Sequence, residues 1–209
     1  RNGRIIYLDK VNSERVIMVP NLNLAQSVIE TYDKAFDENK SQSFISAKLN
    51  FFKDAIVMLY SYGRVNEAGN LYKQLRAQDP TPHKEPLDVF VQREWAEDVK
   101  NASQPVITSL LFARLTEMYL YIGNGDMDTA RALRDQAFFM YTDYQKGAKA
   151  DAKLEQRIGL PPFNTFMRNA YEAVLNALDD AGKAQLKAQI GAMLAKEQAE
   201  REARQGAAQ

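Results

Sequence analysis

The feature that most constrains this chain is a helical period that begins at Asn21 and continues to the C-terminus. Apolar side chains recur every three to four residues, so each segment has one apolar face, and glycines and prolines separate the segments. Asn21 or Asn23 is expected to cap the first helix. The pattern predicts eight helices, over about 21–36, 43–62, 66–78, 86–100, 105–122, 128–144, 162–178 and 180–204.

Residues 1–20 follow a different period. The runs "RIIYL" (4–8) and "RVIMVP" (15–20) are rich in β-branched and aromatic residues, and turn-forming residues lie between them, which predicts an antiparallel β-hairpin or a strand extension. Because an isolated hairpin is marginally stable in water, we expect the helices or another sheet to cover its apolar side chains: Ile5, Tyr7, Val16, Ile17 and Val19. The predicted fold class is therefore all-α with a small N-terminal β-hairpin.

The balance of charges argues against nucleic-acid binding. The 209 residues include 27 lysines and arginines and 27 aspartates and glutamates, and the two signs alternate without a basic stripe. The most apolar stretch, 105–123, carries Arg114 and Glu117 near its middle, which favours a buried core helix over a transmembrane segment. A soluble, cysteine-free chain is compatible with the cytoplasm and with export to a bacterial periplasm. Because the chain starts at Arg1 rather than Met, we expect any targeting signal to lie upstream.

Few residues are suited to catalysis or metal binding. There is no cysteine, and His83 is the only histidine, so thiolate chemistry, a His-based triad and a histidine-rich metal site are excluded. We expect His83 to lie on the surface, in the proline-rich loop 79–88. No catalytic residue, metal or cofactor is therefore assigned. Two acidic pairs stand at expected helix starts, where acids cap free amides: Asp126 with Asp128 and Asp179 with Asp180.

Residues 59–80, "LYSYGRVNEAGNLYKQLRAQDP", have the spacing of a helical repeat. Gly63 permits a tight turn, Ala68 lets two helix backbones approach closely, and Pro80 ends the second helix. The stretch 49–82 resembles a tetratricopeptide repeat, whose unit is a pair of antiparallel helices, and a degenerate second copy covers about 109–144. The second copy has two extra residues in the turn. Five of its residues are expected to take corresponding places: Phe112 for Phe52, Leu115 for Ala55, Tyr119 for Leu59, Gly123 for Gly63 and Ala130 for Ala68.

The resemblance implies both an architecture and a use. It implies helix hairpins stacked as a short α-solenoid at 21–147, after the β-hairpin of 1–20. Composition, rather than the resemblance, predicts a polar linker with glycines and prolines at 146–162 and a C-terminal helical pair with an alanine-rich, frayed tail at 148–209. Members of the family bind a protein or peptide in a concave groove lined by the first helix of each pair. By this resemblance the candidate partner-binding residues are Asn50, Lys53, Tyr60, Glu117 and Tyr121.

We therefore expect a non-enzymatic domain that binds or scaffolds another protein. Two alternatives remain open. The first is a helical accessory subunit or domain of a larger enzyme whose catalytic part lies elsewhere, which an upstream catalytic domain in the full-length gene would favour. The second is a carboxylate-based hydrolase within this chain, which a deep pocket holding two close carboxylates would favour.

Overall fold

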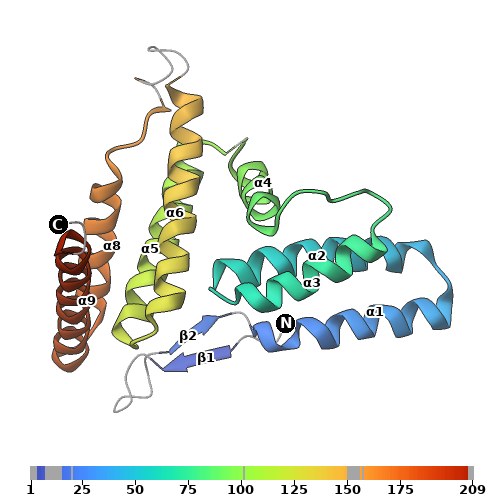
Figure 1. Cartoon of the computed structure of the whole chain (residues 1–209), viewed down its shortest axis with the longest axis horizontal. Helices are drawn as coiled ribbons and strands as arrows, with labels where there is room; N and C mark the ends of the chain where they lie inside the picture. Colours follow the sequence, from blue (N-terminus) through green and yellow to red (C-terminus); the bar gives the residue numbers. More distant parts are fainter. Residues whose placement is uncertain are drawn as a thin grey trace.

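The computed structural model of the chain describes residues 4–7, 16–19, 21–100, 102–149, 156 and 158–206. This described part is built almost entirely from helices (Figure 1), which confirms the predicted helical class. All eight helices predicted from the period are present: α1 (Ala25–Asn39), α2 (Gln42–Ser61), α3 (Val65–Gln78), α4 (Leu87–Lys100), α5 (Gln104–Gly123), α6 (Met127–Ala148), α8 (Phe163–Ala177) and α9 (Asp180–Gly206).

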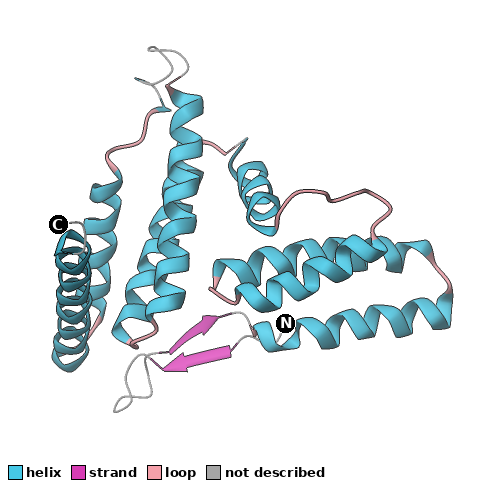
Figure 2. Cartoon of the chain, in the orientation of Figure 1, coloured by secondary structure: helices cyan, strands magenta, loops and turns pink. Residues whose placement is uncertain are grey.

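Two short strands precede the helices (Figure 2). They are β1 (Arg4–Tyr7) and β2 (Val16–Val19), which pair antiparallel with Arg4 opposite Val19 and Tyr7 opposite Val16. Residues 8–15, which join the strands, lie outside the described part of the chain. The expected cover over the apolar side chains of this segment therefore stays a prediction.

The first helix, α1, begins later than expected and has no asparagine cap. A short 3-10 helix, Leu22–Leu24, precedes it, and Asn21 makes no side-chain capping bond there. Leu24 is the N-cap residue of α1, so the prediction that Asn21 or Asn23 caps this helix is wrong. The reason is that the backbone already turns within 22–24, which places Asn23 inside the turn and Asn21 ahead of it.

The helices α2 and α3 form an antiparallel hairpin around a glycine turn. Gly63 has a φ of +74°, in the left-handed region that favours glycine. Across this turn the Arg64 N–H donates to the Leu59 carbonyl at 2.9 Å, which satisfies one of the free carbonyls at the end of α2. Ala68 lies in the buried cluster between the helices and is 0% exposed.

A second hairpin, formed by α5 and α6, has a turn of the same length. Residues 62–64 join α2 to α3, and residues 124–126 join α5 to α6. Gly125 has a φ of +79°, and the Asp126 N–H donates to the Tyr121 carbonyl at 3.0 Å, which matches the bond across the first turn. The two hairpins therefore share one turn geometry.

The predicted pairing of residues between the two hairpins is wrong in part. Gly125, and not Gly123, takes the left-handed conformation of Gly63, because Gly123 is still the last residue of α5. The two extra residues expected in the second turn do not exist, because α2 and α5 each have 20 residues and the two turns have the same length. Phe112 is 38% exposed, whereas Phe52, whose place it was expected to take, is completely buried.

Two buried clusters lie inside the helices. The first is formed by α1, α2, α3 and α4 and includes Phe52, Leu75 and Phe90. The second is formed mainly by α5, α6, α8 and α9, and α5 is at its centre, packed against the other three (Figure 1). By length and composition, α5 is the one described helix that could cross a membrane. One of its faces is buried in the second cluster, consistent with the predicted core helix.

The expected linker at 146–162 begins as helix. α6 continues to Ala148, which is buried, so the first part of this segment is not a linker. At the far end, the Gln145 side chain donates to the Leu160 carbonyl and accepts from the Leu160 N–H, both at 3.1 Å. Both α8 and α9 then pack on α5. The proposed domain boundaries remain a prediction.

Replacing Ala68 by leucine tests the close packing of α2 and α3. The site is completely buried, so the added side chain must displace neighbours, and we expect the free energy of unfolding to fall by about 1–3 kcal/mol. Urea denaturation followed by circular dichroism measures this. Ala188→Leu, on an exposed position of α9, is the matched control and should change stability little. Equal effects of the two substitutions would contradict the packing.

Candidate functional site

The five candidate residues taken from the resemblance lie in different surroundings. Asn50 is exposed on α2. Lys53, one turn further along, pairs with Asp79 at 3.7 Å. Tyr60 is half-buried, and its ring meets Trp95 of α4 edge-on, with the centroids 5.9 Å apart. The α2 residues therefore already have partners within the chain, apart from the exposed Asn50.

Glu117 and Tyr121, the two candidates on α5, come together around Tyr62. The Tyr62 hydroxyl donates to Glu117 Oε1 at 2.6 Å, and the Tyr62 and Tyr121 rings lie 6.1 Å apart. Burial raises the pKa of Tyr62, and the bond to Glu117 raises it further. Arg114 donates to the other oxygen of Glu117 at 3.2 Å. Tyr121 is only 8% exposed, so this group stabilises the interior and leaves little surface for a partner.

His83 is buried, so the prediction that it lies on the surface is wrong. It is 6% exposed, and its ring lies 5.5 Å from that of Phe90. Its Nε2 atom is 2.8 Å from a carboxylate oxygen of Asp79, whose other oxygen accepts from the Thr81 N–H at 2.8 Å. The physical reason is that the loop lies against Tyr72 of α3 and Phe90 of α4, where Asp79 supplies a hydrogen-bond partner for the buried ring.

Burial opposes ionisation of Asp79, but its partners outweigh that effect. The hydrogen bond with His83, the Thr81 N–H and the charge of Lys53 together lower the pKa of Asp79. This pair is enclosed by protein on most sides, since the side chains of His83 and Asp79 are 4% and 5% exposed. We interpret it as a lock on the loop rather than as a reaction centre.

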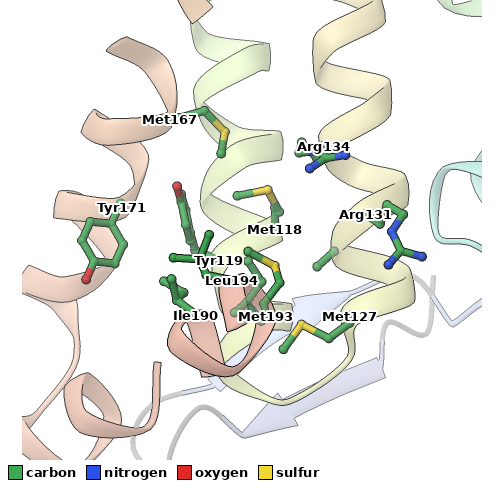
Figure 3. Close-up of a pocket in the computed structure, with 12 residues that line it drawn as sticks. Met118, Tyr119, Met127, Arg131, Arg134, Met167, Tyr171, Ile190, Met193 and Leu194 are labelled. Carbon is green, nitrogen blue, oxygen red and sulfur yellow. The ribbon is translucent and has the colours of Figure 1, made fainter. Parts of the chain in front are cut away.

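A different feature offers open, apolar surface to a ligand. This methionine groove, about 420 Å³ in volume, lies over α5 between α6, α8 and α9 (Figure 3). Each of the four helices contributes one methionine: Met118, Met127, Met167 and Met193. The remaining apolar or aromatic lining is Tyr119, Ile122, Ala130, Tyr171, Ile190 and Leu194.

The groove stays open because of how the helices pack. Within the described residues, the backbone of α5 lies close to those of α6, α8 and α9, whereas α6 meets α8 through the rings of Phe138 and Tyr141 against Phe163 and is not packed closely on α9. Side chains alone therefore fill the space between these helices. Leu194, at the edge, is 56% exposed, and the rings of Tyr119 and Tyr171 lie 5.4 Å apart in its lining. An exposed leucine beside several methionines forms an apolar surface. Contact of this surface with water is unfavourable in free energy, so covering it with a ligand is favourable.

Two arginines of α6 give the methionine groove a positive edge. Arg131 and Arg134 are both among its lining residues (Figure 3), and none of the described residues that line it is an aspartate or glutamate. Each has an exposed partner on its own helix, Asp128 at 3.8 Å and Asp135 at 3.2 Å. Exposed pairs of this kind contribute little to stability. Both guanidinium groups can therefore exchange these partners for an anionic group of a ligand.

Ile190, Met193 and Leu194 share one face of α9, but the apolar period that predicts the helix does not distinguish a groove from a core. Methionine is common in protein cores, so its presence on an apolar face did not indicate a groove. The available signal was the distribution: four of the seven methionines fall on four different helices.

Two predictions about acidic residues are confirmed. Asp126 accepts from the Thr129 N–H at 3.1 Å at the start of α6, and Asp179 accepts from the Gly182 N–H at 2.8 Å before α9. Both therefore act as helix caps. Across the described ranges, no three or more metal-ligating side chains lie close enough together to hold an ion.

Comparison with known proteins identifies no relatives. No family model matches the sequence, and no curated protein and no solved structure matches the chain.

The Asp79–His83 pair predicts a specific dependence of stability on pH. Because the pKa of Asp79 is lowered in the folded protein, its contribution is present above about pH 4, the ordinary range of aspartate, and is lost as the pH falls below it. We expect Asp79→Asn to cost about 1–3 kcal/mol at neutral pH and the difference from wild type to shrink in acid. Urea denaturation over a pH series measures this.

The exposed Asp180 provides the control for the pH series. Its side chain is fully solvent-accessible, so Asp180→Asn loses only the small interaction with the start of α9 and should stay close to the wild-type curve at every pH. A difference between Asp79→Asn and wild type that stays constant from neutral pH to acid would show that ionised Asp79 does not stabilise the fold.

Proposed function

We propose that this chain is a non-enzymatic helical domain that binds another protein, and that the methionine groove is its binding surface. The single observation that carries the proposal is an open apolar groove with a positive edge. It combines adaptable methionine side chains, an exposed leucine and two exchangeable arginines. Its helix hairpins form a short tetratricopeptide-like solenoid, preceded by the N-terminal β-hairpin, and the shared turn of the two hairpins supports this arrangement.

The occupant we propose is an amphipathic helix of the partner protein with acidic residues beside its apolar face. A groove between two helices over a third accepts apolar side chains spaced one turn apart on such a helix. The volume of about 420 Å³ has room for a few side chains, and not for a whole helix, so the partner helix would lie on top of it. Carboxylates of that helix would meet Arg131 and Arg134 at the edge.

A designed peptide tests this proposal directly. The probe is a fluorescent helical peptide with leucines on one face and glutamates flanking them, and a second peptide carries lysines in place of the glutamates. We expect the acidic peptide to bind more tightly and its affinity to fall as salt is raised. Fluorescence anisotropy measures both affinities.

Two substitutions in the groove separate its apolar and charged contributions. Leu194→Gln should weaken binding of the acidic peptide about tenfold, through loss of apolar contact, with little change in stability because the residue is exposed. Arg134→Gln should weaken binding and also reduce its salt dependence. The matched controls are Val106→Gln, equally exposed on α5 outside the groove, and Arg76→Gln on α3.

The proposal fails if the acidic and basic peptides bind equally or if the groove and control variants behave alike. Saturation of the groove by a medium-chain fatty acid such as octanoate, with no binding of either peptide, would instead assign it to a small apolar acid.

A further inference from the structure

α6 also borders a second cavity, which lies between α2, α4 and α6. Its volume is about 420 Å³, and three aromatic residues from three helices line it: Tyr60, Trp95 and Phe139. The centroid of the Trp95 ring lies 5.9 Å from that of Tyr60 and 5.6 Å from that of Phe139, and the planes are inclined by 67° and 52°. We call this space the aromatic cleft.

The charges around the aromatic cleft are mainly negative. Asp128 and Asp135 of α6 line it, and Arg131 is the one cationic residue among the described residues of its lining; Asp135 also pairs with the exposed Arg134 at 3.2 Å. Burial raises the pKa of Tyr60, and the negative charges of Asp88 and Asp135 raise it further, so both carboxylates act at this ring. The cleft therefore has the opposite charge to the methionine groove, although Arg131 borders both.

Aromatic walls and nearby carboxylates favour the same class of ligand. The faces of tryptophan, tyrosine and phenylalanine attract a cation within about 6 Å through the ring quadrupole. Carboxylates at the mouth attract the same charge over a longer range, and they repel an anion. An organic cation with an apolar stem satisfies both features, because the stem covers the ring surfaces that the charge does not reach.

We propose that the aromatic cleft binds the lysine or arginine side chain of a polypeptide. A side chain, rather than a small free ammonium ion, is favoured because the cleft has room for a methylene stem and the adjoining backbone as well as the charged tip. This proposal is independent of the methionine groove, since the two cavities share Arg131 alone.

A substitution of Arg131 tests the charge requirement of the aromatic cleft and of the methionine groove at once. Its guanidinium lies 3.8 Å from Asp128, so it already neutralises part of the negative charge at the cleft. Removing it should strengthen binding of a cation there, whereas the same change should weaken binding of an acidic peptide in the methionine groove. A single substitution, Arg131→Gln, therefore has opposite expected effects at the two sites.

Trp95 provides the measurement, because it is the only tryptophan in the chain. Its indole N–H, 3.3 Å from Ser61 Oγ, gives one side-chain signal in a proton–nitrogen NMR spectrum. The probes are N-acetyl-lysinamide and N-acetyl-argininamide, with uncharged N-acetyl-norleucinamide as the shape control and choline as a free ammonium ion. We expect the two cationic amino acid probes to shift the indole signal saturably, with millimolar dissociation constants, and norleucine to leave it unchanged.

The variants then identify the groups responsible. Asp128→Asn combined with Asp135→Asn should raise the dissociation constant of the lysine probe about fivefold or more, and Arg131→Gln should lower it about twofold. Asp180→Asn and Leu194→Gln are the controls, because both residues lie outside the cleft, and each should leave the titration unchanged. Because the substituted side chains are exposed, we expect little change in stability, and thermal unfolding of each variant checks this.

Three results would overturn the proposal. An equal shift with norleucine would show that charge is not recognised. An unchanged dissociation constant in the double aspartate variant would show that these carboxylates do not act on the ligand. Choline binding as tightly as the lysine probe would assign the cleft to free ammonium ions rather than to side chains. Because Leu194→Gln affects only the methionine groove, failure here is distinguishable from failure of the proposed function.

Discussion

The placement of the two hairpins depends on Tyr62. It belongs to the turn after α2, yet its side chain is buried in the second cluster, against Tyr121, and donates to Glu117 at 2.6 Å. Its carbonyl accepts from the buried Thr129 hydroxyl at 3.3 Å, at the start of α6. A Cβ added to the neighbouring Gly63 would lie 3.4 Å from a backbone oxygen of α6, so the turn itself fits closely against that helix. One tyrosine and its turn thus contact both helices of the second hairpin.

This contact makes α6 the element between two potential binding sites. The aromatic cleft is lined by residues of α2, α4 and α6, so it exists only while the first hairpin is held against α6. The methionine groove lies within the second cluster, over α5. Arginines of α6 border the groove, and aspartates of the same helix line the cleft, so one helix surface separates regions of opposite charge. Such a separation suits a domain that recognises a partner with both acidic and basic elements.

Local patterns predicted the helices because helix formation depends on near neighbours. The apolar period and glycine turns located all eight helices, and the spacing of Asp126 and Asp179 from the following amides identified two caps. The remaining features depend on contacts between distant residues. His83 is buried because Phe90 and Asp79 enclose it, and Tyr121 is interior because Tyr62 reaches it. The methionine groove exists because α6 and α9 both pack on α5 without packing closely against each other, which no local period encodes.

The most direct test of this account is the unfolding of a Tyr62→Ala variant, measured segment by segment by hydrogen exchange. If Tyr62 couples the two clusters, the most protected amides of α2 and α5 in the wild type exchange with the same free energy. Tyr62→Ala should then reduce stability by about 3 kcal/mol or more and give the two helices different free energies. Tyr32→Ala removes a half-buried ring packed on Phe51. It should lower the stability of the protein without giving α2 and α5 different exchange free energies. Different exchange free energies in the wild type, or equal ones retained in Tyr62→Ala, would contradict the account.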